Sequence, residues 1–161
     1  MNKDISVLLV EDHAMTRLGL GIVLEQAKGL KLIAEAEDGL TAVEKAKEFK
    51  PDVILMDIGL PNIDGIEATR RIKEFNPDAK ILIFTSREEE KDVFDSFASG
   101  ANGYIMKGTH PEQMVNAIKA NKKDTVMPTI EEIKKEIIES EISPKDLRIV
   151  LDIINKYAKW A

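Results

Sequence analysis

The stretch that most constrains the fold is residues 53–65, V-I-L-M-D-I-G-L-P-N-I-D-G. It begins with a run of four apolar residues, Val53–Met56, and then reaches a carboxylate, Asp57. Turn-forming residues follow, and Asp64-Gly65 opens an amphipathic segment. A short apolar run between turn formers is typical of a parallel strand that is buried on both faces. Such a strand needs covering helices on each side, so this stretch predicts an α/β sheet with Asp57 at the end of a central strand.

The first 122 residues repeat one alternation of two patterns. Short β-rich apolar runs predict strands at 5–10, 30–36, 53–56, 80–85 and 103–106. Segments with helical spacing follow each run and predict helices at 13–27, 39–49, 65–75, 86–99 and 111–122. Strands that alternate with helices predict a doubly wound parallel sheet joined by right-handed crossover connections.

Two local patterns support the first and fourth of these helices. Met15, Leu18 and Ile22 recur at helical spacing within 13–27. Residues 86–89, S-R-E-E, match a capping box, with Ser86 at the N-cap and Glu89 at N3. The fourth helix is therefore predicted to begin directly after Ser86.

Composition excludes several classes of protein. The chain has no cysteine, which rules out disulfides, thiol nucleophiles and thiolate zinc sites. A net charge of −6 argues against a general nucleic-acid binder, which usually carries a basic surface. No apolar run approaches the ~18 residues that a membrane span requires. The first ten residues lack the features of a signal peptide, so we expect a cytoplasmic protein with no membrane partner.

Polar functional groups stand at the ends of four predicted strands: Glu11-Asp12, Asp57, Thr85 and Lys107. Each has an ordinary interpretation by itself, as a cap, a helix N-terminal pair or a surface residue. Because the carboxyl ends of parallel strands meet at one edge, we expect these groups to converge. Clustered carboxylates attract a hard cation such as Mg²⁺, and a lysine with a hydroxyl complements a phosphoryl group. The combination indicates phosphoryl chemistry, with a carboxylate that can form an aspartyl phosphate.

Together with Leu60-Pro61 and Asp64-Gly65, these residues resemble the receiver domain of two-component response regulators, over about residues 4–122. The sequence E-D-H-A-M-T-R-L-G-L after the first strand is similar to the NarL/LuxR-type subfamily. The resemblance implies a flavodoxin-like (βα)5 fold with strand order 2-1-3-4-5. It also implies a Mg²⁺-dependent phospho-accepting switch, rather than an enzyme, with a sensor histidine kinase as partner.

The resemblance assigns a role to each matching residue. By it, Asp57 is the phospho-acceptor, Glu11 and Asp12 form the acidic pocket, Lys107 pairs with the phosphoryl group, and Thr85 and Tyr104 are switch residues. Asp12, Asp57 and the backbone carbonyl of Gly59 would bind Mg²⁺. Two positions depart from the family pattern. Gly108 stands where many receivers have proline, which predicts a more permissive loop, and the acidic pair is Glu-Asp instead of Asp-Asp.

Other functions and residues fit less well. An aspartate-based phosphohydrolase would carry a second aspartate two residues after the nucleophile, but Gly59 has no side chain that could protonate a leaving group. A pure interaction scaffold, with the pocket intact but unused, is a further alternative. His13 and His110 stand at a helix start and before a proline, and we expect both to be exposed structural residues.

Residues 123–161 are predicted to form a linker and two helices, separate from the receiver domain at 1–122. Apolar spacing indicates one helix near 130–138, and Ser143-Pro144 begins another. The second resembles the first helix of a LuxR-type output domain, but no recognition helix follows within the sequence. The extension is thus not a complete helix-turn-helix domain, and we expect no direct DNA binding by the chain as given. These two helices either dock on the receiver domain or form a surface for a partner. A homodimer, formed through these helices or through the receiver surface, is therefore one expectation.

Overall fold

One parallel sheet dominates the computed structural model, which describes residues 3–121. Its strands are β1 (Ile5–Val10), β2 (Leu30–Ala36), β3 (Val53–Met56), β4 (Lys80–Thr85) and β5 (Gly103–Met106). The helices are α1 (Ala14–Gln26), α2 (Gly39–Phe49), α3 (Gly65–Phe75), α4 (Glu90–Ala98) and α5 (Pro111–Ala120). The strand order β2-β1-β3-β4-β5 confirms the predicted flavodoxin-like topology. The linker and helices predicted at 123–161 lie outside the described residues.

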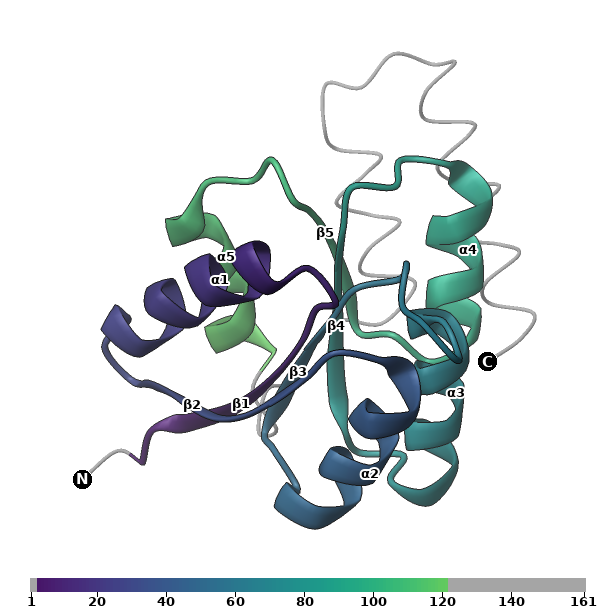
Figure 1. The fold of residues 1–161 in the computed structure, drawn as a ribbon, viewed down its shortest axis with the longest axis horizontal. Helices are drawn as coiled ribbons and strands as arrows, with labels where there is room; N and C mark the ends of the chain where they lie inside the picture. The colour runs from purple at the N-terminus through teal and green to yellow at the C-terminus, as the bar shows by residue number, and fades with distance from the viewer. Residues whose placement is uncertain (1–2, 122–161) are drawn as a thin grey trace, which may run out of the picture. The chain divides into compact units, whose positions relative to one another are not determined.

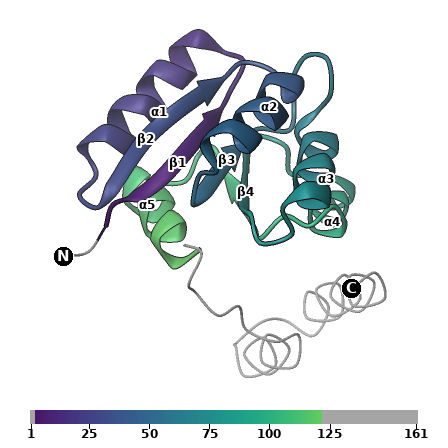
Figure 2. The same ribbon diagram turned by 90° about the horizontal axis from the view of Figure 1, so that it is seen from below.

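Helices cover both faces of the sheet. Figures 1 and 2 show α1 and α5 together on one face and α2, α3 and α4 on the other. All four residues of β3 are buried, as expected for the central strand of such a sheet. No helix in this described part combines the length and the hydrophobicity that crossing a lipid bilayer requires.

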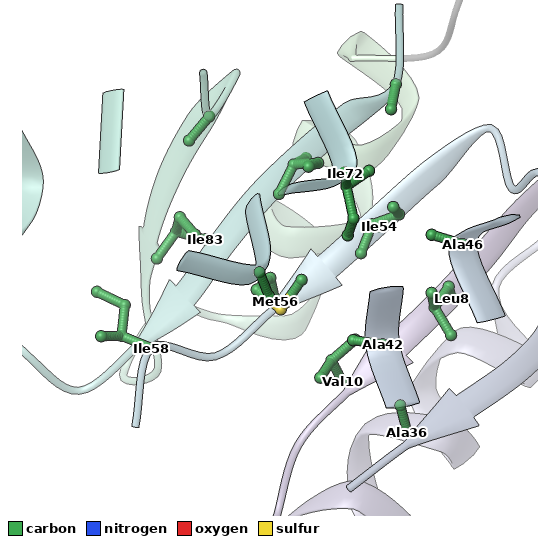
Figure 3. Packing of buried hydrophobic residues seen from close by; sticks show 14 residues of the cluster. Leu8, Val10, Ala36, Ala42, Ala46, Ile54, Met56, Ile58, Ile72 and Ile83 are labelled. Carbon is green, nitrogen blue, oxygen red and sulfur yellow. The ribbon is translucent and has the colours of Figure 1, made fainter. Parts of the chain in front are cut away.

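Two hydrophobic clusters, one on each face, hold these layers together. Successive strand side chains point to opposite faces of a sheet. Ile54 and Met56 therefore pack toward α3, where Ile72 is fully buried (Figure 3), while Leu55 packs on the opposite face in the cluster that includes Leu24 of α1. Full burial of one such side chain contributes about 1.5–3 kcal/mol.

The start of α3 follows from its sequence. Asp64 is the N-cap residue, and its carboxylate accepts a hydrogen bond from the backbone N–H of Glu67 at 2.8 Å. Ala68 and Ile72 place the apolar stripe against the sheet, and the Arg71 guanidinium pairs with Glu67 at 2.9 Å on the outer face. The helix starts directly after the loop that follows Asp57, so its cap also ends that loop.

The start of α4 differs from its prediction. The helix begins at Glu90, with Glu89 at the N-cap and no side-chain capping bond, so the predicted capping box at Ser86 is wrong. The backbone N–H of Arg87 donates to Thr85 Oγ1 at 3.3 Å, and the Arg87 carbonyl accepts a hydrogen bond from Tyr104 at 2.7 Å. These bonds hold residue 87 against the ends of β4 and β5, and the helix starts only beyond them.

Helix α1 lies where its spacing predicts, but the residues that indicated it are not in the core. Met15 is 81% exposed, Leu18 59% and Ile22 48%. The buried side of α1 is instead formed by Gly21 and Leu24. Periodicity therefore identified the helix without identifying the face that packs on the sheet.

Candidate functional site

A lysine from one strand end bridges two carboxylates from two others. Lys107 Nζ donates to Asp57 Oδ2 at 2.9 Å and lies 2.8 Å from Glu11 Oε2. The backbone N–H of Lys107 donates to the carbonyl of Thr85 at 2.9 Å, which continues the pairing of β5 with β4. The predicted convergence of these three side chains at the carboxyl edge of the sheet is thus present in the structure.

One lysine serves two buried carboxyl groups in this bridge. Glu11 is 1% exposed and Asp57 is 6% exposed, and Lys107 is the cation between them. Burial alone would lower the pKa of Lys107, but the adjacent carboxylates outweigh burial, so its pKa is raised. Lys107 therefore stays protonated and is one cation shared by two buried carboxyl groups.

The backbone fixes the Asp57 carboxylate in place. Its Oδ1 accepts a hydrogen bond from the N–H of Ile58 at 2.8 Å, while the N–H of Asp57 donates to the carbonyl of Val10 at 3.1 Å. The first residue of α3, Gly65, donates its N–H to the Ile58 carbonyl at 2.8 Å. The loop after Asp57 is consequently folded back tightly against the start of α3.

The acidic pair after β1 suits a hard divalent cation. Asp12 Oδ1 is buried and makes no hydrogen bond, and Glu11 Oε2 makes only the ion pair with Lys107, without hydrogen-bond geometry. His13 Nδ1 lies 3.1 Å from Glu11 Oε1 and 3.1 Å from Asp12 Oδ1. Potential ligand atoms of Glu11, Asp12 and His13 all lie within 4.8 Å of one another. Because carboxylate oxygens are the ligands that Mg²⁺ prefers, the carboxyl groups of this set fit that ion, whereas the imidazole of His13 does not.

Of the predicted magnesium ligands, only Asp12 belongs to this group. Asp57 lies outside it, with Oδ2 held by Lys107. Gly59 is exposed in the loop after β3, and a Cβ added to it would lie 3.6 Å from Arg87 Nη2, an ordinary contact. His13 was expected to be structural, yet its ring nitrogen is within reach of both carboxylates while its side chain is 72% exposed.

The two predicted switch residues both contact Arg87. Thr85 is 1% exposed at the end of β4 and accepts the Arg87 N–H, and the Tyr104 hydroxyl donates to the Arg87 carbonyl. Burial raises the pKa of Tyr104, as do the carboxylates of Asp92 and Asp57, while the Arg87 guanidinium opposes the rise. Sequence reasoning missed Arg87, although its place two residues after a strand-end threonine was a usable signal.

Another missed residue, Arg17, supports the acidic pair from α1. Its Nη1 donates to the Glu11 carbonyl at 2.9 Å, and its Nη2 lies 3.3 Å from Glu37 Oε1. An arginine one helical turn after His13 was a weak sequence signal, because most surface arginines make no such contact.

Two positions near Lys107 were singled out from the sequence. Gly108 does not have positive φ, and a Cβ there would meet nothing within 4 Å. The loop thus does not use the freedom that glycine allows. His110 caps α5, where its Nδ1 accepts the Glu112 N–H at 3.2 Å, so it has the structural role that was expected.

Known proteins share this sequence and fold. The family model of the response regulator receiver domain matches residues 7–119. The uncharacterized transcriptional regulatory protein YxjL of Bacillus subtilis is 41% identical over 121 residues, which cover 74% of this chain and 56% of YxjL. The chain spans about half the length of the curated relatives it matches.

Solved structures agree with the family match. A two-component response regulator of the LuxR family from Aurantimonas sp. SI85-9A1 gives a TM-score of 0.73 at 34% identity, covering 85% of this chain and 100% of that one. A chain of the CheX–CheY–BeF3–Mg²⁺ complex from Borrelia burgdorferi gives a TM-score of 0.69 at 28% identity, covering 73% of this chain and 89% of that one.

Proposed function

The chain belongs to the response regulator receiver domain family, and on that premise we propose that it is a phosphorylation-controlled switch that accepts a phosphoryl group at Asp57. The observation that carries the proposal is the Lys107 bridge to Glu11 and Asp57. It gathers a nucleophilic carboxylate, an acidic pocket and a cation at one edge of the sheet. Relatives of the chain include response regulators of the NarL/LuxR type.

The proposed phosphoryl donor is a histidine residue of a sensor kinase, which would place the reaction in the cytoplasm. An oxygen of Asp57 forms the new bond to phosphorus, and the bond from phosphorus to the imidazole nitrogen breaks. The released imidazole takes a proton from water. Lys107 Nζ lies 2.9 Å from Asp57 Oδ2 and would pair with the phosphoryl oxygens.

Magnesium would be held by Asp12, Asp57 and the Gly59 carbonyl. When bound, it offsets the negative charge that carboxylates and phosphoryl oxygens bring together. Support for this cofactor is the buried Asp12 Oδ1, which has no hydrogen bond, beside a pocket that holds the buried carboxyl groups of Glu11 and Asp57. The CheY complex named above contains BeF3 and Mg²⁺ together.

Thr85 and Tyr104 would carry the signal outward. Thr85 is next to the pocket and Tyr104 lies on β5, and both are joined to the loop before α4 through Arg87. A phosphoryl group that attracts the Thr85 hydroxyl would change those bonds and favour one of two states of this surface. The proposed output is a change in dimerisation or in a transcription-related partner.

A phosphohydrolase function has less support. Gly59 supplies no acid, and the nearest side-chain atom to its Cβ position belongs to Arg87, which does not release its proton. We therefore propose a switch with at most slow loss of its own phosphoryl group.

Acetyl phosphate with Mg²⁺ tests phospho-acceptance directly. Intact-mass measurement should show one added phosphoryl group on the wild-type chain and none on Asp57→Asn. Size-exclusion chromatography with light scattering, with and without beryllofluoride, then reports whether the modified state changes its oligomeric state. An equal adduct on Asp57→Asn, or none on the wild type, would refute the proposal.

A further inference from the structure

Arg87 stands in the loop between β4 and α4, outside the set of site residues expected from the sequence. We propose that it is a phosphoryl-sensing residue, whose guanidinium leaves Asp92 and binds the phosphoryl group on Asp57. The inference rests on the proposed function, because it needs a phosphoryl group at that position. It adds a binding residue and a route from the pocket to α4.

The Arg87 side chain already lies close to the loop that follows Asp57. Arg87 Nη2 lies 3.6 Å from the place that a Cβ on Gly59 would occupy. Gly59 is two residues after Asp57, and its missing side chain leaves the space above this loop open to the guanidinium. The arginine therefore extends across the loop that follows the phospho-acceptor.

The present partner of Arg87 holds it weakly. Its Nη1 lies 3.7 Å from Asp92 Oδ1, which is an ion-pair distance but too long for a hydrogen bond. The Arg87 side chain is 48% exposed, so solvent screens the attraction. No backbone acceptor for the guanidinium is present among the described contacts. The side chain is thus free to exchange one anion for another.

A phosphoryl group is the stronger anion for this guanidinium. It carries nearly two negative charges and several acceptor oxygens, whereas Asp92 carries one charge. The planar fork of arginine matches phosphate oxygens in two parallel hydrogen bonds. The charges of Asp57, Asp92 and Arg87 all act on the pKa of Tyr104, so the three groups lie within electrostatic range of one hydroxyl.

Exchange of partners has consequences beyond the pocket. The backbone of Arg87 is bonded to Thr85 and to Tyr104, so movement of this residue disturbs both. Asp92 is in the first turn of α4 and loses its cation when the guanidinium leaves. The transfer therefore links phosphorylation of Asp57 to the start of α4.

Beryllofluoride binding in the presence of Mg²⁺ tests this inference on the full chain, by calorimetric titration of the wild type and four variants. Arg87→Ala should weaken binding about tenfold, because a charge-assisted contact is lost. Asp92→Asn should tighten it about two- to threefold, because the competing anion is removed. Arg70→Ala is the matched control, since Arg70 is an exposed arginine on α3 paired with Glu67, and its removal should change the affinity less than twofold.

Arg87→Ala and Asp92→Asn are expected to change the affinity for beryllofluoride in opposite directions. Equal effects of Arg87→Ala and Arg70→Ala would overturn the inference, because only general electrostatics would remain. Weaker binding by Asp92→Asn would also overturn it, because Asp92 would then support the site instead of competing with it. Arg87→Lys, which keeps the charge and the fold but not the fork, should fall between wild type and Arg87→Ala. A wild-type chain that binds no beryllofluoride would refute the proposed function itself, a distinct outcome.

Discussion

Gly65 has the least room for a side chain among the glycines of the described residues. A Cβ at this position would lie 1.8 Å from the carbonyl oxygen of Asp57 and 2.9 Å from the Cα of Ile58. Both atoms belong to the backbone, so no side-chain rotation can relieve the contact. Glycine is required here because the backbone after Asp57 passes directly over the start of α3.

Replacement of Gly65 by alanine should therefore lower the free energy of unfolding by about 3 kcal/mol, the upper range for overpacking. Urea unfolding followed by circular dichroism measures this loss. Gly19→Ala is the control within α1, since a Cβ there meets nothing within 4 Å. Because alanine is the better helix former, that change should raise the stability by about 0.5–1 kcal/mol. Similar losses for both variants would contradict this account of Gly65.

At the scale of single residues, the sequence predicted the residues of the pocket better than the side chains around it. Asp57, Glu11 and Lys107 were expected to converge because each ends a strand, and Lys107 contacts Asp57 across 50 positions of sequence. Arg87 and Arg17 were missed because they contact the site from a loop and from a helix turn. The local sequence marks both positions as near the site, but it does not show where the side chains extend.

Helix α1 shows that helical spacing of apolar residues does not by itself tell which of them are buried. Leu24 is fully buried and packs in the cluster shared with α5, while Leu18 is 59% exposed on the same helix. Both are leucines in a helix with apolar residues on several sides, so the sequence pattern does not show which of the two is more buried. Contact with the sheet decides between them.

The two leucines should respond differently to the same substitution. Leu24→Ala should cost about 3 kcal/mol of unfolding free energy, since it removes buried methyl groups and leaves a cavity. Leu18→Ala should change stability by less than about 0.5 kcal/mol. Thermal and urea unfolding of the two variants measure the difference. If Leu18→Ala proved as costly as Leu24→Ala, the exposed face of α1 would have to be covered in solution.

The start of α4 shows a different limit at this scale. A capping box is a local signal, and residues 86–89 contain its side chains. Bonds from Arg87 to Thr85 and Tyr104 are long-range or strand-end contacts that hold the segment out of the helix. Tertiary hydrogen bonds thus displaced the helix start to Glu90.

Ligand binding should stabilise the described domain as a whole, because its pocket exists only when β1, β3 and β5 are assembled. A ligand that binds only the folded state adds about 2.7 kcal/mol at one hundred times its dissociation constant. Beryllofluoride with Mg²⁺ should therefore raise the melting temperature of the full chain. Removal of Mg²⁺ by a chelator should abolish the rise, and Asp57→Asn should not show it. Fluoride with Mg²⁺ but no beryllium is the control, and an equal rise there would indicate a nonspecific salt effect.

The sequence alone determined the alternation of strands and helices, the central position of β3 and the set of groups at the strand ends. These follow from periods of two and 3.6 residues and from the rule that parallel strands end at one edge. The tertiary structure decided which face of α1 is buried, where α4 begins, that His13 lies against Glu11 and Asp12, and that Arg87 lies between Gly59 and Asp92. Those features depend on how loops and side chains meet across the fold, and short-range periodicity carries no information about such contacts.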